Sequence, residues 1–372
     1  MRVLTIGSLP PEWGGPERGG VATFHASLLT GLLGHRADVE VVGAMPPSPL
    51  DREVPVPIFV RPEAVSRADF YANLLERMQP DVVLMNHIAH TVGVTHARLR
   101  PPVPAVGVVH SWHSVTFAPG EEERGRAWAV TQEAMGGLGA LVAPSHHALA
   151  EGRDLSFHYP AIASVIHNPL PPLYMDEEID ANAHRRHGVL YLGGLIPRKD
   201  PVALLEAAAL LPALDVTLVG QGQLEEALRS QIEARDLGGR VRLAGALPGA
   251  GHLAQVRDLL LRAQALCLPS RSESFGLVFA EALACGTPIV GFGPTVREIR
   301  ETMGIEVGEP LDRSTPVEIS AAIERALAAT WDRQELRRAT LEAFGLPRVT
   351  DRYLELFSRV ASRQAAGSHG QP

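Results

Sequence analysis

The residues with the clearest chemical pattern lie in one stretch, PSRSESFGLVFAEALACGTP, at 269–288. Glu273 follows an apolar run and is expected in a loop, and Gly276 opens a predicted helix. Glu281 lies inside that helix, where all of its neighbours are apolar. A carboxylate on such a helix must be paired or bound to a ligand, because an unpaired buried charge is costly. Two sugar hydroxyls are a suitable partner, since a carboxylate accepts two hydrogen bonds at once. The alternative is a structural salt bridge.

Two adjacent cations, Arg198 and Lys199, follow a strand-like run and the glycine pair Gly193-Gly194, where a helix is expected to begin. Cations at a helix N-terminus are unfavourable unless an anion neutralises them. The pattern therefore predicts a phosphate site, with a solvated Arg-Lys turn as the alternative. Of the 34 basic residues in the chain, Lys199 is the only lysine, which favours a specific role for it.

Glycines mark two further turns. The loop after the first predicted strand carries Gly14-Gly15 and Gly19-Gly20 before a helix, an arrangement that lets backbone amides approach a phosphate. It lacks the tight G-x-G of a dinucleotide fingerprint, so a plain surface loop is an equal alternative. The turn Gly220-Gln221-Gly222 is explained as well by a tight connection as by a ligand.

Several histidines occur in close pairs, but no matching cysteine or carboxylate set accompanies them, so no metal site is predicted. His110 differs because it ends the predicted strand Val106–Val109. We expect it to face a cleft between two domains, where it donates to a substrate oxygen or accepts a proton.

The elements that must position these residues follow a repeated strand–turn–helix order. Short β-rich apolar runs alternate with stretches of helical periodicity, which implies parallel sheets covered by helices on both faces. The expected strands are 3–7, 39–43, 56–60, 82–85, 106–109, 141–143, 164–166, 189–193, 216–220, 241–245, 266–269 and 289–291. The expected helices are 21–33, 67–77, 127–136, 146–151, 201–211, 224–235, 252–264 and 276–285, with mostly helix after 315.

A turn-rich break at 168–172, followed by an acidic and polar stretch, divides the pattern into halves. We therefore expect an α/β protein with two Rossmann-like, doubly wound domains, 1–168 and 169–346. A C-terminal helix at about 347–363 packs back on the first domain, and 364–372 form a disordered tail. Ligands bind such folds in the crevice at the carboxyl ends of the strands.

Composition excludes several classes of function. The formal net charge is −8 and there is no basic block, which argues against nucleic acid as a partner. No apolar run approaches the roughly 20 residues of a membrane helix, and the N-terminus is too short in apolar residues for a signal peptide. We expect a cytoplasmic protein, with peripheral membrane contact left open for a lipid-linked acceptor. Cys267 and Cys285 are expected to be buried free thiols.

Together these residues resemble the retaining glycosyltransferases of family 4, which have the GT-B fold. The most specific part is the Glu-x7-Glu motif from Glu273 to Glu281. The Gly-Gly loop, His110, the HNP turn at 167–169 and the GGLIPRKD segment follow in the expected order. The resemblance implies metal-independent transfer of a hexose-type sugar from a nucleoside-diphosphate sugar, commonly a UDP-sugar, to a small-molecule or lipid-linked acceptor. It implies no cofactor.

The resemblance also implies roles by position. Glu273 would bind sugar hydroxyls, Glu281 the ribose and Lys199 the diphosphate, while Leu247 would lie near the nucleobase and His110 near the reacting carbon. The implied donor site comprises Gly19, Gly20, Arg198, Lys199, Leu247, Glu273, Ser274, Phe275, Gly276, Leu277, Val278 and Glu281, with His110, Lys199 and Glu273 as its catalytic residues.

Two positions depart from the family pattern. Gly194 stands where the family usually has an arginine for the diphosphate, and Asp200 stands where it has a glycine. Arg198 is the available substitute cation, although it is displaced along the chain. Two other functions therefore stay open: a nucleotide-sugar epimerase of related fold, and a non-catalytic sugar-nucleotide-binding partner of an active transferase. The acceptor would be read by loops at 46–62 and 112–123, which we expect to be irregular.

Overall fold

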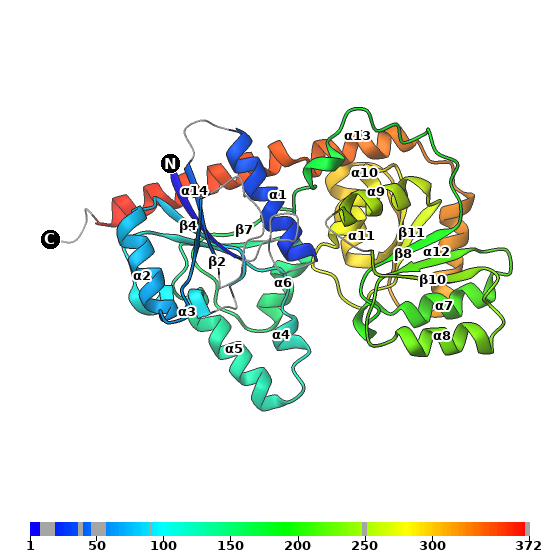
Figure 1. The fold of residues 1–372 in the computed structure, drawn as a ribbon, viewed down its shortest axis with the longest axis horizontal. Coiled ribbons are helices and arrows are strands. Elements are labelled where there is room, and N and C mark those ends of the chain that lie inside the picture. The colour runs from blue at the N-terminus through cyan, green and yellow to red at the C-terminus, as the bar shows by residue number, and fades with distance from the viewer. Residues whose placement is uncertain (8–18, 36–39, 46–56, 89–90, 248–250, 369–372) are drawn as a thin grey trace. The chain divides into compact units, whose positions relative to one another are not determined.

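The computed structural model describes residues 1–7, 19–35, 40–45, 57–88, 91–247 and 251–368 (Figure 1). The chain divides into two compact units. The first comprises residues 1–171 together with 346–372, and the second comprises residues 172–345.

The first unit is built on a parallel sheet whose described strands run in the order β3-β2-β1-β4-β5-β6-β7. The strand order reverses between β1 and β4, which is the switch point where doubly wound sheets place their ligand crevice. The strands are β1 (Arg2–Ile6), β2 (Glu40–Met45), β3 (Ile58–Val60), β4 (Val82–Met85), β5 (Ala105–Val108), β6 (Ala140–Ala143) and β7 (Ala163–Val165).

Helices cover both faces of this sheet. Along β4, Val82 and Leu84 enter one buried cluster, whereas Val83 and Met85 enter another, as expected for a strand with two covered faces. α14 packs beside α1 on the first of these faces (Figure 1). The helices are α1 (Gly20–His35), α2 (Arg67–Met78), α3 (Thr91–Leu99), α4 (His113–Thr116), α5 (Glu121–Met135), α6 (His146–Asp154) and α14 (Leu346–Ser368).

The second unit repeats the plan with a parallel sheet in the order β10-β9-β8-β11-β12-β13, so its switch point lies between β8 and β11. The strands are β8 (Val189–Leu192), β9 (Val216–Val219), β10 (Val241–Gly245), β11 (Ala265–Leu268), β12 (Ile289–Phe292) and β13 (Gly308–Leu311). The helices are α7 (Pro201–Leu210), α8 (Glu225–Ala234), α9 (His252–Arg262), α10 (Leu277–Ala284), α11 (Gly293–Met303), α12 (Pro316–Ala328) and α13 (Arg333–Phe344).

The predicted fold class is confirmed, and each predicted strand has a counterpart within a few residues. Four described helices and strands were missed: α3, α4, α11 and β13. The segment 112–123, expected as an irregular loop, instead contains α4 and the start of α5, which begins at Glu121 rather than 127. Most of the other predicted loop, 46–62, lies outside the described residues. α14 continues to Ser368, into the segment expected to be a disordered tail.

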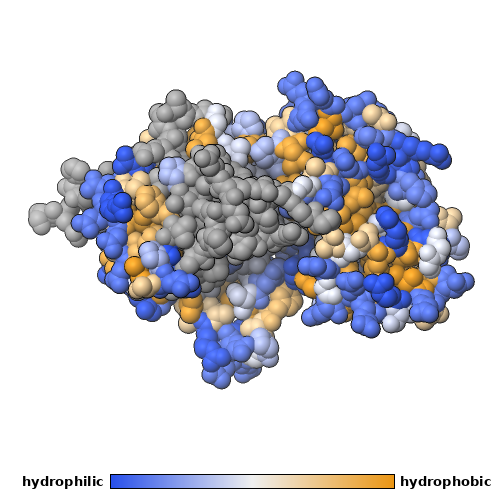
Figure 2. Space-filling view, in the orientation of Figure 1, coloured by the Kyte–Doolittle hydropathy of each residue, from blue (hydrophilic) through white to orange (hydrophobic). Residues whose placement is uncertain are grey.

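Cys267 and Cys285 are both buried and free, as predicted. Hydrophilic and apolar side chains are interspersed on the face shown in Figure 2. Among the described helices, none is both long and apolar enough to cross a membrane.

Candidate functional site

The carboxyl ends of β8 and β11 carry the two loops that hold the predicted donor residues of the second unit. The backbone N–H of Arg271 donates to the carbonyl of Arg198 at 2.8 Å, which ties the loops together. The Arg198 guanidinium also donates to the carbonyl of Ser272 at 2.9 Å. The turn 197–199 and the loop before α10 therefore form one platform at the switch point.

Lys199 and Glu273 form an ion pair in this platform, although 74 residues separate them in the sequence. The hydroxyl of Ser270 donates to Oε1 of Glu273 at 2.7 Å, and a guanidinium nitrogen of Arg198 lies 4.0 Å from the same oxygen. Burial raises the pKa of Glu273, but the Lys199 ammonium, with Ser270 and Arg198, outweighs burial and holds this pKa below its usual value.

All of these contacts are made by one carboxylate oxygen. Within the described residues, Oε2 of Glu273 has no hydrogen-bond or ion-pair partner. Glu273 can thus hold the two cations in place with one oxygen while the other accepts a hydroxyl. Ser270 was not predicted as a site residue. Its position three residues before Glu273 in a loop is the only signal that the sequence offers.

Arg198 and Lys199 lie just before the helix predicted at 201–211, as expected, but neither residue belongs to that helix. They lie in a short 3₁₀ turn, and α7 begins only at Pro201, after its N-cap Asp200. The anion that faces the two cations in the chain itself is Glu273. The predicted need for a neutralising anion is therefore met in part by a carboxylate, which weakens that argument for phosphate.

Asp200 explains one departure from the family pattern. Its backbone is left-handed, with φ 46° and ψ 51°, a conformation that favours glycine but that Asp tolerates. Its side chain accepts from the N–H of Ala203 at 3.4 Å and pairs with Arg271 at 2.8 Å. Aspartate therefore replaces the usual glycine by adding a helix cap and an ion pair.

α10 presents its N-terminus next to this platform. Gly276, the N-cap, has φ +64°, and a Cβ there would come within 2.6 Å of the Phe279 ring. No side chain in the described part of the chain caps the helix, so among these residues the amides of Leu277 and Val278 have neither an intrahelical partner nor a side-chain cap. Such amides, with the helix dipole, attract an anion. Ser274 and Phe275, in the loop just before Gly276, are both buried.

Glu281 is 6% exposed on α10. Among the described residues its carboxylate has no hydrogen-bond or ion-pair partner, which argues against the structural salt bridge. Burial raises its pKa to about 7. The hydroxyl of Tyr174, itself fully buried and without a hydrogen-bond partner in the described part of the chain, interacts electrostatically with this carboxylate.

The glycine turns have different explanations. Gly220 has φ +145°, and a Cβ there would lie 1.9 Å from the carbonyl oxygen of Gly193, so the tight connection accounts for it. Gly194 is under no such constraint. A Cβ at Gly194 would meet only Ile196 carbons and the Gln221 carbonyl oxygen, at 3.8 Å or more. Among the described residues, a Cβ at Gly194 therefore meets only ordinary van der Waals contacts.

The remaining predicted residues lie elsewhere. Gly19 and Gly20 are exposed at the start of α1, where a Cβ would meet no atom of the described residues within 4 Å. Gly14 and Gly15 lie outside the described residues. His110 follows β5 in the first unit and is half-buried, and Leu247 follows β10 in the second unit. The geometry of the second unit brings together Arg198, Lys199 and Glu273. The functional roles of the predicted site residues stay predictions.

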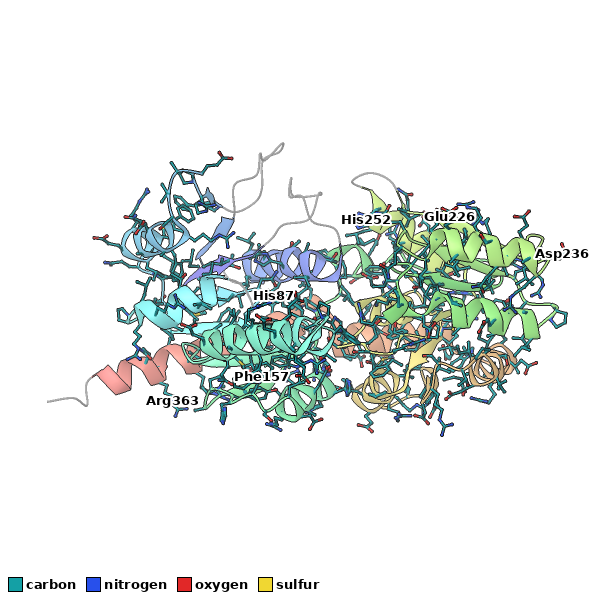
Figure 3. All side chains as sticks on the ribbon, turned by 90° about the horizontal axis from the view of Figure 1, so that it is seen from below. His87, Phe157, Glu226, Asp236, His252 and Arg363 are labelled. Carbon is teal, nitrogen blue, oxygen red and sulfur yellow. The ribbon has the colours of Figure 1, made fainter. Side chains whose placement is uncertain are left out.

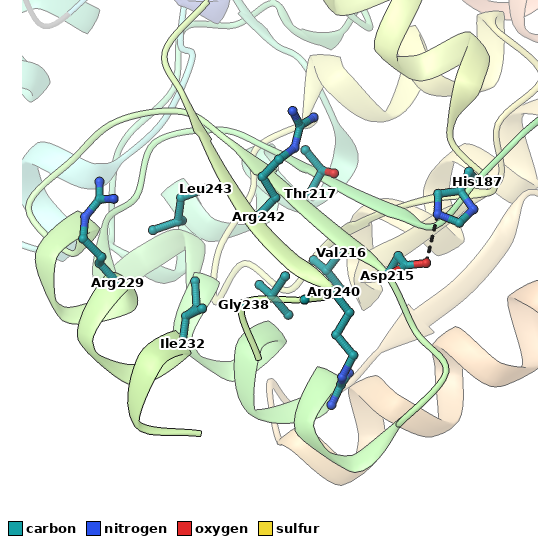
Figure 4. A pocket seen from close by; sticks show the side chains of 12 residues that line it. His187, Asp215, Val216, Thr217, Arg229, Ile232, Gly238, Arg240, Arg242 and Leu243 are labelled. Carbon is teal, nitrogen blue, oxygen red and sulfur yellow. Dashed lines mark ion pairs between the residues drawn. The ribbon is translucent and has the colours of Figure 1, made fainter. Parts of the chain in front are cut away.

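Two hollows in the second unit differ in their relation to these residues. One of about 540 Å³ is lined by residues that precede or begin strands, among them His187, Asp215 and Gly238 (Figure 4). It therefore lies away from the carboxyl ends of the strands. The other, of about 310 Å³, is lined by Asp200 and Ser270 together with residues that end or follow β12 and β13, so it adjoins the platform. Within the described residues there is no cluster of three or more metal-ligating side chains.

Two family models match successive parts of the chain. Residues 18–174 match glycosyltransferase family 4, and residues 176–342 match glycosyl transferases group 1. The chain belongs to the family 4 glycosyltransferases. This family 4 member is 31% identical over 315 residues to the D-inositol 3-phosphate glycosyltransferase of Geodermatophilus obscurus. The match covers 73% of this chain but 65% of that relative, slightly less than two thirds of its length.

Solved structures show the same fold. The family 4 chain resembles Anabaena HepE in complex with UDP and glucose, with a TM-score of 0.69, 17% identity, and coverage of 96% of this chain and 99% of that one. It also resembles the lipopolysaccharide outer core galactosyltransferase WaaB in its apo form, with a TM-score of 0.71, 15% identity, and coverage of 96% and 100%. At such low identity these likenesses establish the fold, which is GT-B.

Proposed function

We propose that this protein is a retaining, metal-independent glycosyltransferase that moves a hexose-type sugar from a nucleoside-diphosphate sugar to an acceptor. The observation that carries the proposal is the cluster of Arg198, Lys199 and Glu273 beside the uncapped N-terminus of α10. Cations and free amides suit a diphosphate, and a carboxylate with one unengaged oxygen suits a sugar hydroxyl.

The charges of the reaction fit this cluster. Breaking the sugar–phosphate bond leaves extra negative charge on the diphosphate and an oxocarbenium-like sugar. Lys199, Arg198 and the amides of Leu277 and Val278 would stabilise the leaving group without a metal. Each well-placed donor contributes about 3 kcal/mol to the transition state. Among the described side chains we assign no nucleophile, and the leaving phosphate would help to deprotonate the acceptor.

The donor is proposed to be a UDP-sugar, because HepE was solved with UDP and glucose. Glu281 would hold the two ribose hydroxyls, and its buried, unpartnered carboxylate supports that role. The acceptor would be a small molecule or a lipid-linked sugar. The name of the Geodermatophilus relative makes an inositol phosphate the first acceptor to test.

The test is calorimetric titration with UDP- and GDP-sugars, followed by a donor-turnover assay with and without inositol phosphate. We expect micromolar binding of one nucleotide class and acceptor-dependent release of the nucleoside diphosphate. Lys199→Ala should abolish turnover, while Lys199→Arg should retain part of it. Full activity of Lys199→Ala would refute the diphosphate role, and donor conversion without net transfer would indicate an epimerase.

The chain could instead be a non-catalytic sugar-nucleotide-binding subunit, and Gly194 is the observation that favours this second candidate. Without the family's usual arginine, the leaving group has one cation fewer. Tight nucleotide binding without turnover under any acceptor would support this function over the first.

A further inference from the structure

The buried polar residues around His110 in the first unit have no assigned role. Asn86 follows β4, His110 follows β5, and His25 lies on α1, so all three meet at the switch point of the first sheet. Asn86 is 1% exposed and His25 is also 1% exposed. His87, the next residue after Asn86, is labelled in Figure 3, and its ring centroid lies 6.2 Å from that of His110.

Asn86 is fixed from three sides. Its backbone N–H donates to the carbonyl of Ile6 at 2.9 Å, and its side-chain Nδ2 donates to the carbonyl of Val21 at 3.4 Å. A Cβ on Gly7 would come within 2.6 Å of the Asn86 Cβ, so glycine at that position leaves room for this side chain. Because Nδ2 faces the Val21 carbonyl, the opposite atom Oδ1 must face His110. The reversed amide would set two acceptors against each other.

Oδ1 of Asn86 lies 3.1 Å from Nε2 of His110. An amide oxygen only accepts, so Nε2 must carry the proton. Burial, followed by the neighbouring His87, lowers the pKa of His110 to about 3. A hydrogen bond with the Asn86 backbone opposes this shift in part and His25 adds a little to it, so the ring is neutral at physiological pH. A neutral ring with its proton on Nε2 has a lone pair on Nδ1. The edge of Phe24 packs on the same ring, with centroids 4.8 Å apart.

We propose that Asn86 is a positioning residue that holds His110 as the Nε2–H tautomer, so that Nδ1 accepts a hydrogen bond from a hydroxyl of the donor sugar. The inference rests on the proposed function, in which we include the role that the family resemblance implies for His110 at the donor sugar. It replaces the open expectation that His110 either donates or accepts: this imidazole can only accept at Nδ1. It also assigns Asn86 to the donor site without direct contact with the substrate.

The tautomer can be measured in the free protein, independently of activity. Long-range ¹H–¹⁵N spectra of the histidine-labelled chain, with His110→Ala for assignment, should show a protonated Nε2 and a bare Nδ1 from pH 6 to 8. Asn86→Leu removes the acceptor at similar volume and should produce a mixture of tautomers. Asn73→Leu, at an exposed asparagine of α2, is the control and should change nothing. A protonated Nδ1 in the wild type, or an unchanged tautomer in Asn86→Leu, would overturn the proposal.

The pH dependence of kcat/KM in Asn86 variants distinguishes a role in positioning His110 from a role in packing alone. Asn86→Leu should lower kcat/KM about 10-fold, the effect of one lost hydrogen bond. Asn86→Asp keeps an acceptor but places a negative charge beside the ring, which raises the His110 pKa. This variant should recover part of the lost activity at pH 8.5 and lose it on acidification, through an acid limb absent from the wild type. An Asn86→Asp profile parallel to the wild type would contradict the proposal.

The tautomer of His110 and the role of His110 at the donor sugar can be tested separately. If the Nε2–H tautomer is observed but His110→Ala turns over donor at the wild-type rate, the role of His110 in the proposed function is wrong and the tautomer assignment stands. If Nδ1 carries the proton while His110→Ala is inactive, the positioning inference is wrong and the proposed function stands.

Discussion

The raised pKa of the buried Glu281 carboxyl predicts how the affinity for a nucleotide sugar depends on pH. Burial raises its pKa to about 7, while the hydroxyl of Tyr174 and the thiol of Cys285 titrate far above that range. Ribose hydroxyls donate to the ionised carboxylate, so binding should select the deprotonated form. We expect affinity for UDP-glucose to fall about tenfold between pH 8 and pH 6, with proton release on binding near pH 7. Titration calorimetry in two buffers of different ionisation enthalpy measures both quantities.

Glu281→Gln is the control for that titration, because it has no carboxylate to ionise. Its affinity should be weak and independent of pH. A wild-type affinity that is flat across this range would show that Glu281 does not hold the ribose.

The same pKa shift predicts an effect on stability. The folded value of about 7 lies above the ordinary 4.5, so between these values the native state holds more protons than the unfolded chain. Stability attributable to Glu281 is therefore present below pH 4.5 and is lost as the pH rises to 7. At pH 8, Glu281→Gln should have a higher free energy of unfolding than the wild type, by at most about 3 kcal/mol. Denaturant titration measures this difference. The difference in the free energy of unfolding should shrink as the pH approaches 5. A variant less stable than the wild type at pH 8 would show that burying the ionised Glu281 carboxylate does not destabilise the protein.

Gly194 offers a gain-of-function test at the residue scale. Because a Cβ there would make only ordinary contacts, Gly194→Arg should fold and add a third cation for the diphosphate, beside Arg198 and Lys199. UDP affinity should rise about 5- to 10-fold, as for one charge-assisted hydrogen bond. Gly238→Arg adds the same charge at an open position in the hollow of Figure 4 and should leave UDP affinity unchanged. Equal effects of both variants would mean that overall charge is responsible.

The sequence predicts candidate site residues, but not the contacts that those residues make. The apolar neighbours of Glu281 predicted a buried, unpaired acid, and burial without a partner among the described residues is what the structure has. The Lys199–Glu273 pair joins positions 74 residues apart, which no local pattern encodes. The sequence does not single out Asn86 either. Its contacts with the Val21 carbonyl and with His110 join residues that are far apart in the chain.

At the scale of elements, there are physical reasons why the sequence did not predict α11, β13 and α3. α11 opens with Gly293-Pro294, which reads as a turn, although proline is favoured at the first position of a helix. β13 contains Pro310, which argues against a central strand, yet β13 is the edge strand of its sheet, where proline is tolerated. α3 mixes β-branched residues and a glycine and therefore lacks clear helical periodicity.

The N-terminus of α10 depends on one backbone conformation. Gly276→Ala would combine a positive φ with a clash against the Phe279 ring, so the amides of Leu277 and Val278 would shift. Gly304→Ala, at the end of α11, has nearly the same φ of +68° and an open Cβ direction. Both variants should lose about 1 kcal/mol of stability from the backbone, but only Gly276→Ala should lose more and also weaken UDP binding. Equal stability and affinity in the two variants would remove α10 from the site.

At the scale of the whole molecule, the C-terminal helix returns to the first unit after the second is complete. Tyr353, Phe357 and Val360 of α14 are buried in the same cluster as Phe24 and Leu28 of α1. Burying large apolar side chains stabilises by about 1.5–3 kcal/mol each, and a domain has only about 5–15 kcal/mol in total. Removing residues 346–372 should therefore unfold the first unit. The second unit, which is continuous from 172 to 345, should stay folded.

Hydrogen–deuterium exchange followed by mass spectrometry distinguishes the units in one sample. In the shortened chain, peptides from α1 should lose protection, while peptides from α10 and β11 keep it and still gain protection on adding UDP. Removing only residues 369–372 is the matched control and should leave both sets unchanged. Protected α1 peptides without α14 would mean that the helix adds little to the first core. Loss of protection in α10 as well would show that the two units fold as one cooperative body, because the contacts within residues 172–345 would then be insufficient to hold the donor platform.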